Sequence, residues 1–186
     1  MKLVFLHGYP ASGKYTIAKE LESKIGCGVF HNHLTIEVAK QFFEFGTKHF
    51  WELVNELRYN CVRLAAKNSS KTVIFTACYS HPEDLEFFEL IENMVLQAGG
   101  EVLPVYLSCE FEELERRVGN LSRIEMGKLT TIEGLQKSLT NWNCIAVPRN
   151  NSLVIFTDKK TPLQCCQEII DKLHLMTDLF AGYSKI

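Results

Sequence analysis

Residues 3–16 read Leu-Val-Phe-Leu-His-Gly-Tyr-Pro-Ala-Ser-Gly-Lys-Tyr-Thr, and this stretch decides the fold. An apolar strand runs into a loop bounded by Gly8 and Gly13, and the loop runs into a helix that begins near Lys14. A strand, a glycine-bounded loop, a lysine and a helix form the context of a phosphate-binding P-loop. A plain glycine-rich turn explains this less well, because the helix dipole disfavours a lysine at its N-terminus unless an anion is present.

The residues of the loop have separate predicted roles. Gly8 permits the sharp turn off the strand, and Gly13 lets backbone amides face an anion with no side chain in the way. Lys14 is predicted to contact the outer phosphates and to act in catalysis, helped by the positive end of the helix. The predicted cofactor-binding residues are Gly8, Ala11, Ser12, Gly13, Lys14, Tyr15 and Thr16.

The motif departs from G-x-x-x-x-G-K-[ST] at one position. Tyr15 stands where a Ser or Thr hydroxyl normally contacts Mg²⁺, and a phenol is too long for that contact unless the helix shifts. Thr16, about 100° further round the helix, is expected to meet the α-phosphate. None of the expected strands ends in an aspartate that could hold the metal instead. ATP and Mg²⁺ are the expected cofactors, with the protein ligand of the metal left open.

The bulk composition limits the class of protein. The chain has 186 residues, of which 46% are hydrophobic, so it can bury the core of one ordinary domain. The net charge of -2 gives no general attraction to nucleic acid or to an anionic membrane. The predicted partners are a nucleotide and a small-molecule substrate, with no nucleic acid and no membrane, in a monomer or weak dimer. Seven cysteines without a C-x-x-C pair are typical of reduced thiols, which favours a cytoplasmic location.

Strand and helix patterns alternate along the whole chain. This alternation predicts an α/β fold with a doubly wound parallel sheet. Pro104 falls inside the fourth expected strand, where a missing ladder donor is awkward for a central strand. Residues 161–164 have the form of a helix capping box with proline at the first helical position. The five expected strands cover residues 3–7, 29–30, 72–77, 102–107 and 153–156.

Two segments stand apart from this alternation. Helical patterns at about 34–45 and 48–67 follow the second strand with no strand between them, which is more than a plain crossover needs. They predict a helical flap on the substrate side, over about 34–67. A polar stretch at about 119–131, after a short helix at 110–118, is predicted to form a small lid. Both segments are expected to belong to a single domain over residues 1–186.

The P-loop, the flap after the second strand and the basic lid after the fourth together resemble the small P-loop kinases. That group includes nucleoside monophosphate kinases, shikimate kinase, gluconate kinase and chloramphenicol phosphotransferase. The resemblance implies a P-loop NTPase fold, in which three α/β/α layers surround a five-stranded parallel sheet of order 2-3-1-4-5.

Within this group the pattern is nearest to shikimate kinase. That family ends its second strand in Asp-x-Asp, continues x-x-Ile-Glu, and later carries Gly-Glu-x-x-Phe-Arg. The corresponding stretches here read His-Asn-His at 31–33, Leu-Thr-Ile-Glu at 34–37 and Gly-Thr-Lys-His-Phe-Trp at 46–51. The frame is kept, but histidines replace both aspartates and Trp51 replaces the carboxylate-binding arginine, which argues against shikimate itself. The chain also resembles uncharacterised bacterial ATP-binding proteins in which the second strand ends in His-Asn-His.

Three of the six arginines lie close together beside the expected lid. Arg116 and Arg117 are neighbours on a helix and point about 100° apart, so they cannot both face one ligand. By resemblance to the lid arginines of small kinases, Arg117 is expected over the nucleotide and Arg123 on the γ-phosphate, both as catalytic residues. The alternative is that Arg116 or Arg117 only pairs with Glu112 or Glu113 at helical spacing. Lys128, further along the lid, is a secondary candidate.

The acceptor is expected at the end of the second strand, since substrates of such folds bind outside the carboxyl ends of the strands. His33 takes the place of the base-like aspartate in the shikimate kinase pattern and is predicted to be the general base. His31 and Asn32 beside it, Arg58 on the flap and Tyr79 after the third strand are predicted to contact the substrate. The alternative is a histidine pair that only hydrogen-bonds backbone at a strand end.

These features predict an ATP-dependent kinase that transfers a phosphoryl group to a hydroxyl of an unidentified small molecule. The alternative is a nucleotide-binding protein without kinase activity, which Tyr15 and the absent aspartates favour. A nucleoside monophosphate kinase has less support, because the flap shows no pattern for recognition of a base.

Overall fold

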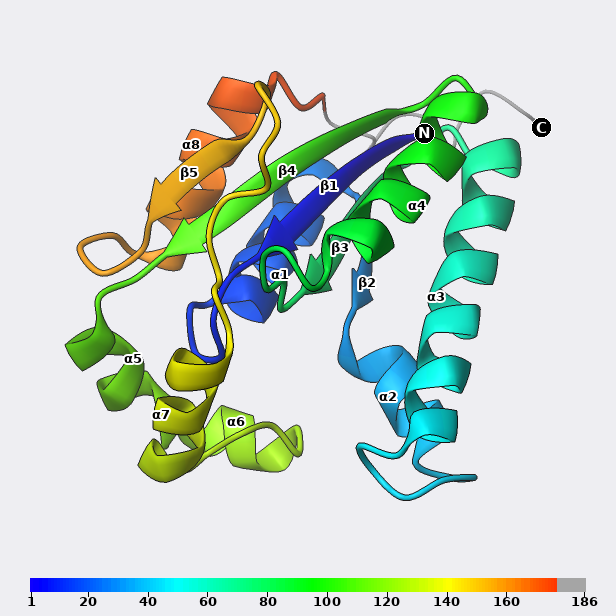
Figure 1. The fold of residues 1–186 in the computed structure, drawn as a ribbon. Helices are drawn as coiled ribbons and strands as arrows, with labels where there is room; N and C mark the ends of the chain where they lie inside the picture. The colour runs from blue at the N-terminus through cyan, green and yellow to red at the C-terminus, as the bar shows by residue number, and fades with distance from the viewer. Residues whose placement is uncertain (177–186) are drawn as a thin grey trace.

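A computed structural model describes residues 1–176 of the chain, and Figure 1 shows its arrangement. The elements in chain order are β1 (Lys2–His7), α1 (Lys14–Ile25), β2 (Gly28–His31), α2 (His33–Ala39), α3 (Lys48–Asn68), β3 (Thr72–Ala77), α4 (Leu85–Gln97), β4 (Glu101–Ser108), α5 (Phe111–Val118), α6 (Leu121–Glu125), α7 (Ile132–Asn141), β5 (Leu153–Phe156) and α8 (Pro162–Leu173).

The five strands form one parallel sheet in the order β2-β3-β1-β4-β5. This confirms the predicted fold class and strand order. Pro104 lies opposite Phe5 of β1, while pairing of β4 with β5 begins only at Val105. One side of Pro104 therefore has no strand beside it, which makes a residue without an N–H tolerable at this point of the sheet.

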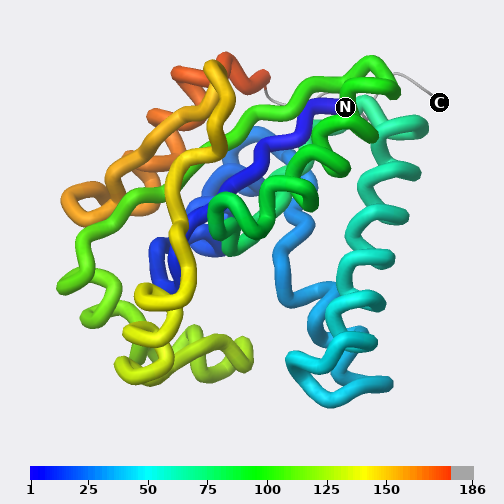
Figure 2. Tube along the Cα trace, in the orientation of Figure 1, coloured from blue at the N-terminus to red at the C-terminus, as the bar shows by residue number. Residues whose placement is uncertain are grey.

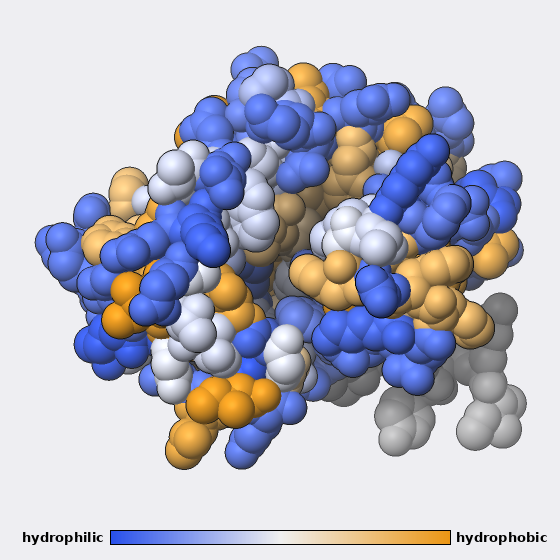
Figure 3. Space-filling view, turned by 60° about the horizontal axis from the view of Figure 1, so that its bottom comes forward, coloured by the Kyte–Doolittle hydropathy of each residue, from blue (hydrophilic) through white to orange (hydrophobic). Residues whose placement is uncertain are grey.

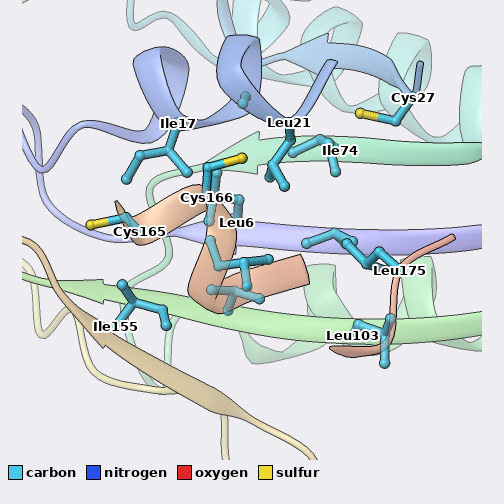
Figure 4. Packing of buried hydrophobic residues seen from close by; sticks show 14 of the residues in the cluster. Leu6, Ile17, Leu21, Cys27, Ile74, Leu103, Ile155, Cys165, Cys166 and Leu175 are labelled. Carbon is cyan, nitrogen blue, oxygen red and sulfur yellow. The ribbon is translucent and has the colours of Figure 1, made fainter. Parts of the chain in front are cut away.

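Helices cover both faces of the sheet because successive residues of a strand point to opposite sides. Val4 and Leu6 of β1 pack against α1 and α8, and Figure 4 shows Leu6 below Cys166. Leu3 and Phe5 face the other way and pack against α3 and α4. Alternate residues of β1 thus belong to two different cores, one on each face of the sheet. Both cores exclude water from this central strand.

Two groups of helices project beyond the carboxyl ends of the strands, as the tube in Figure 2 makes clear. On one side, α5 and α7 pack on the P-loop through Ala11, Leu114 and Leu135. On the other side, α2 and α3 share a separate small cluster that contains Ile36 and Phe50. Viewed from this end, the molecule is hollowed between the two groups (Figure 3).

The structure corrects two of the expected element bounds. The helix expected at 34–45 ends at Ala39, because Phe42 is 69% exposed and leaves the next turn no apolar face to bury. Thr47 then caps α3 by accepting a hydrogen bond from the Phe50 amide. The lid stretch contains the five-residue helix α6, which is too short to show a period in the sequence.

The capping box expected before the last helix is present. The Thr161 hydroxyl accepts from the Gln164 amide, and the Gln164 side chain accepts from the Thr161 amide. Among residues 1–176, no helix combines the length and the apolar composition that crossing a bilayer would need.

Candidate functional site

The loop between β1 and α1 is compact because glycines occupy its two critical positions. A side chain at Gly8 would place its Cβ 2.7 Å from the Leu107 carbonyl oxygen. Gly13 adopts a left-handed φ of 94° and starts α1 without any side-chain cap. The first amides of α1 thus have no side-chain acceptor, and such amides at a helix N-terminus are suited to bind an anion.

Lys14, the first residue of α1, folds back over this loop. Its Nζ donates hydrogen bonds to the carbonyl oxygens of Gly8 and Tyr9, both at 2.7 Å. An ammonium group has three donors, so one remains for a ligand in the loop. Lys14 therefore both closes the loop and leaves a positive charge at its mouth, where it was predicted to meet phosphate.

A cavity of about 650 Å³ opens beside the loop, and we call it the α1–α5 pocket. Ser12, Gly13 and Thr16 line one wall, as expected if Thr16 turns toward the ligand that the loop binds. The other walls come from α1, α5, the residue before α6, the connection between β5 and α8, and the first residues of α8. They are formed by Ile17, Glu113, Arg116, Arg117, Asn120, Thr157, Asp158, Lys159, Lys160, Thr161, Pro162, Gln164 and Cys165.

Arg117 is held in the α1–α5 pocket by protein acceptors. Its Nε donates to Glu113 at 2.6 Å, and its Nη2 donates to the Thr157 carbonyl oxygen at 2.8 Å. Arg116 also pairs with Glu113, but its side chain is 71% exposed, against 19% for Arg117. Hydrogen bonds from Arg116 and Arg117 lower the pKa of Glu113 to about 2. The ion pairs of Arg116 and Arg117 with a glutamate of the same helix, which were the alternative to a role in binding, are thus present. Of the two arginines, only Arg117 also bonds to a second segment, at Thr157.

Arg123 is turned into the lid. Its Nε and Nη2 donate to the Leu129 carbonyl oxygen, at 3.1 and 2.6 Å, and its Nε also donates to the Val118 carbonyl oxygen. Burial lowers the pKa of the guanidinium. In this conformation Arg123 ties the two ends of the lid together, and the predicted contact with a γ-phosphate stays a prediction.

The Tyr15 side chain lies on the other side of the loop, away from the α1–α5 pocket. Its ring meets that of His31 edge-on, with the ring centroids 5.1 Å apart. The Nζ of Lys128 lies 4.3 Å from the centroid of the Tyr15 ring. We call Tyr15, His31, His33 and Lys128 the β2 cluster. Tyr15 thus faces the other residues of the β2 cluster, and Thr16 faces the α1–α5 pocket. Neighbouring residues of a helix point about 100° apart, so they face different sides.

Within the part of the chain that the structure describes, the two histidines of the β2 cluster have no hydrogen-bond partner at Nδ1, although both atoms are buried. Burial lowers the pKa of both rings, with a further contribution from Lys128, and brings the pKa of His33 to about 4. Both imidazoles are therefore neutral at pH 7 and can accept a proton or a hydrogen bond. The Nδ1 of His33 is 4.0 Å from a carboxylate oxygen of Glu37.

Arg58 of α3 is 8% exposed and lies beside Asn32, the residue that follows β2. It donates to side-chain oxygens of Asn32, Thr35 and Asn55, all of which are neutral. In the described part of the chain, no carboxylate forms an ion pair with it. Burial lowers the pKa of the guanidinium to about 10. Arg58 and Asn32 are thus brought together as predicted, in a setting where the hydrogen-bond partners of the cation are neutral and the nearby negative charge comes from Asp84 without direct contact.

Tyr79 does not line the hollow in the way the sequence suggested. The residue is 1% exposed and packs among Phe5, His7 and Phe88 in the core. Its hydroxyl is 2.9 Å from Nδ1 of His81. The surroundings of the ring explain its position by packing alone, and a contact of its hydroxyl with a substrate stays a prediction.

Sequence reasoning missed two residues next to the loop. The Tyr9 hydroxyl donates to the Trp142 carbonyl oxygen and accepts from the Cys144 amide, which ties the loop to the segment after α7. His7 is fully buried, and neither ring nitrogen has a hydrogen-bond partner among the described residues. Burial, with a smaller contribution from Lys14, lowers the pKa of His7 to about 3. Only the position of His7 in an apolar strand could have signalled its burial.

The residues present do not fit a metal ion held by the protein. In residues 1–176, no group of three His, Cys, Asp or Glu side chains is arranged to bind one. Tyr15 cannot substitute for the usual hydroxyl, because its ring is engaged by His31 and Lys128. A divalent cation usually accompanies a nucleotide bound to such a loop. Here the ligands of that cation would have to be phosphate oxygens and water.

Comparison with protein families shows which family the chain belongs to. The model of the AAA domain family matches residues 4–129, more than half of the chain. The chain belongs to the AAA domain family. The matched region includes the P-loop, the β2 cluster and most of the lid. The search of curated proteins gives no significant match.

Solved structures with the same fold include several small kinases. A sugar kinase from Janibacter sp. HTCC2649 aligns with a TM-score of 0.66 at 16% identity, over 94% of this chain and 95% of that chain. An APS kinase from Mycobacterium tuberculosis, in complex with AMPPNP and APS, aligns with a TM-score of 0.65 at 19% identity, over 94% and 98%. Shikimate kinase from Aquifex aeolicus aligns with a TM-score of 0.53 at 19% identity, over 94% and 96%. The predicted resemblance to P-loop small-molecule kinases is confirmed at the level of fold.

Proposed function

We propose that this AAA domain protein is a kinase that transfers the terminal phosphoryl group of ATP to a hydroxyl of a small molecule. One observation carries the proposal. A single P-loop adjoins a large pocket on the Thr16 side and a cluster of neutral histidines and an unpaired lysine on the Tyr15 side. Phosphoryl transfer needs such an arrangement, because it depends on positioning two substrates and neutralising charge between them.

In this proposal the nucleotide lies along residues 8–16. The uncapped amides of α1 and the free donor of Lys14 would hold the β- and γ-phosphates. The rest of the nucleotide would fill the α1–α5 pocket, which at about 650 Å³ is within the usual size of ligand sites. Arg117 would border it, since its Nη1 lies 3.9 Å from the position that a Cβ on Gly13 would take.

The acceptor would lie at the β2 cluster, on the opposite side of the γ-phosphate. Its hydroxyl oxygen forms the new bond to phosphorus, the bond from phosphorus to the bridging oxygen breaks, and that oxygen leaves with ADP. His33 would take the hydroxyl proton. A pKa of about 4 makes His33 a weak base, which suits a loose transition state that needs little proton abstraction.

Other predicted residues have supporting roles. His31, Asn32 and Arg58 would contact the acceptor. In the described part of the chain no carboxylate is in direct contact with Arg58, which favours an acceptor that carries an anionic group. Arg123 would have to leave its carbonyl partners to reach the γ-phosphate, as a lid that closes over the nucleotide would allow. The Tyr79 ring would stay in the core, and only its hydroxyl, beside Nδ1 of His81, would contact the acceptor. No residue is assigned to hold a metal.

The remaining predictions belong to this proposal. Residues 34–67 and 119–131 would act as flap and lid of a single domain over residues 1–186. The seven free cysteines support a cytoplasmic location, where thiols stay reduced. A monomer or weak dimer would suffice, because every residue invoked above comes from one chain. Size-exclusion chromatography at two protein concentrations tests this last point.

The experiment that tests the proposal combines binding with turnover. Calorimetry with ATP measures binding, and a coupled assay for ADP measures turnover on a panel of sugars, hydroxy acids and nucleosides. We expect ATP to bind and at least one acceptor to raise ADP production well above the acceptor-free rate. Failure to bind any nucleoside triphosphate would refute the proposal.

The second candidate is a nucleotide-binding protein without kinase activity. Tyr15 and the lack of a carboxylate cluster favour it, because both remove the usual support for a metal. Tight ATP binding with no ADP produced on any acceptor, with and without Mg²⁺, is the result that this candidate predicts.

A further inference from the structure

Lys128 occupies an unusual position in the lid. Its ammonium lies over the face of the Tyr15 ring, with Nζ 4.3 Å from the centroid. The side chain is partly buried, yet it forms no hydrogen bond and no ion pair with any residue that the structure describes. All three donors of the ammonium group therefore remain available to a ligand.

Among residues 1–176, the charges that act on the pKa of Lys128 are both positive. The lid contributes Arg123, α1 contributes Lys14, and the charges of both lower the pKa of Lys128 further after burial has lowered it. The end of β2 contributes His31 and His33, whose pKa values Lys128 itself lowers. Positive charges from the lid and from α1 thus lie near Lys128, and the groups at the end of β2 beside it are neutral imidazoles.

Three other lysines of the chain show the contrast. Lys40, Lys160 and Lys172 each pair with a glutamate. Among residues 1–176, Lys128 is partly buried without a carboxylate partner, and the nearby charge of Lys14 adds to its own. A partly buried charge without a partner is costly, so a polyanionic ligand is the expected counter-charge at this place.

Tyr15 explains how the ammonium is held there. Its ring stands at the P-loop position whose hydroxyl normally contacts a metal. The face of an aromatic ring attracts a cation and uses none of the N–H donors of the cation. At this position the chain has thus exchanged a metal ligand for a surface that holds an ammonium group.

We propose that Lys128, held over Tyr15, is a catalytic residue that contacts the terminal phosphate of the nucleotide and supplies positive charge where a metal on a P-loop hydroxyl would otherwise act. This inference rests on the proposed function. During transfer, Lys128 keeps its proton and makes no covalent bond. Its donors bind the oxygens of the γ-phosphoryl group as that group moves from ADP to the acceptor oxygen.

Binding of ATP and ADP to the whole protein, with EDTA present, tests the contact. Lys128→Gln removes the charge and keeps a polar side chain, and Lys128→Arg restores a cation that can lie over Tyr15. Lys137→Gln, an exposed lysine on α7, is the matched control. We expect Lys128→Gln to weaken ATP binding at least tenfold and ADP binding less than threefold. Lys128→Arg should bind ATP within threefold of the unchanged protein, and the control within twofold.

Addition of Mg²⁺ gives a second readout. The loss of ATP affinity in Lys128→Gln should shrink to a few-fold, because the metal then neutralises part of the phosphate charge. In turnover, kcat/KM for ATP should fall above about pH 8 in the unchanged protein, where Lys128 loses its proton. Lys128→Arg should lack that fall, because its guanidinium stays charged.

The results separate this inference from the proposed function. Equal loss of ATP and ADP affinity in Lys128→Gln, or unchanged ATP affinity, would overturn the role of Lys128. If ATP still binds the unchanged protein and not Lys14→Ala, the proposed function survives that result. If the unchanged protein binds neither nucleotide, the proposed function fails first.

Discussion

The α1–α5 pocket and the β2 cluster lie on either side of the same loop and differ in how they treat charge. In the pocket, Arg117 already has a carboxylate and a carbonyl as partners. In the β2 cluster, Lys128 and the Nδ1 atoms of the two histidines have no polar partner among residues 1–176. The pocket is formed before any ligand binds, whereas the β2 cluster needs a ligand to satisfy its polar groups.

The difference has a physical consequence for binding. A side chain that is already fixed by its neighbours loses little freedom when a ligand arrives, so the pocket can bind with small rearrangement. Unsatisfied buried groups cost free energy until a partner is supplied, so they discriminate strongly between ligands that do and do not supply it. We therefore expect tolerance on the nucleotide side and selectivity on the acceptor side.

The largest expected effect is at Lys14, which serves both sides. Lys14→Ala should lower the rate of phosphoryl transfer by about 10³-fold, or about 4 kcal/mol, because it removes a charge on the transferring group. Steady-state assay of ADP production with the best acceptor measures this. Lys19→Ala, an exposed lysine on the same helix, is the control. An unchanged rate in Lys14→Ala would contradict the kinase proposal.

Replacement of Arg58 tests whether the acceptor side is separate. Arg58→Met should lower kcat/KM for the acceptor about 100-fold, since one lost charged contact is worth about 2–3 kcal/mol. The ATP dissociation constant should change less than twofold. Arg63→Met, an exposed arginine on the same helix, should change neither quantity. An equal loss of ATP affinity would show that the two sides are not independent.

His7 extends the comparison to the core beneath the loop, where a histidine is also buried without partners. Its pKa is about 3 in the folded chain and about 6.5 in the unfolded one, so only the unfolded chain takes up a proton between these values. The unfolding free energy should therefore fall as pH falls below 6.5, by about 2 kcal/mol at pH 5 from this residue alone.

His7→Phe removes this titration and keeps an aromatic ring among Phe5, Tyr79 and Tyr106. Urea unfolding at pH 7 and pH 5 should show a difference about 2 kcal/mol smaller in the variant than in the unchanged protein. His49→Gln, an exposed histidine, should leave the difference as it is. Parallel pH dependence in His7→Phe and the unchanged protein would disprove the assignment.

The smallest expected effect is in the pre-formed pocket. Arg117→Ala should raise the ATP dissociation constant about tenfold, or about 1.4 kcal/mol, and leave the acceptor KM unchanged. Arg116→Ala, on the exposed side of the same helix, should raise it less than twofold. Titration by calorimetry distinguishes the two variants. An equal effect of both would mean that the pairing of Arg117 with Thr157 has no part in binding.

Much of the fold could be predicted because its signals are local. The P-loop is a contiguous motif, and strands β3 and β5 are apolar runs of the expected length, so their bounds were read correctly. The helix at 34–45 was drawn too long, because Phe42 and Phe43 continue the apolar period but find no core to pack against. The hydrophobic periodicity of a sequence shows which residues could be buried, but it does not show whether another element is present to cover them.

The candidate site divides in the same way. The places of Gly8, Gly13 and Lys14 in the turn between β1 and α1 could be predicted from the sequence, since they follow from spacing within a short loop, and their contact with phosphate stays a prediction. The positions of Arg123 and Tyr79 could not, because each depends on partners that the chain brings together only when it folds. Lys128 was only a secondary candidate, since nothing in its local sequence shows which ring lies beneath it.

The amino-acid sequence alone thus determined a P-loop at the end of the first strand, within a parallel α/β sheet. Those features depend on short-range order: glycine conformations, strand alternation and the start of a helix. Only the tertiary structure decided which cations have counter-charges, which histidines lie unpartnered, and that Tyr15 faces Lys128. Electrostatic environment depends on distances between residues far apart in the chain, and such distances arise only from packing.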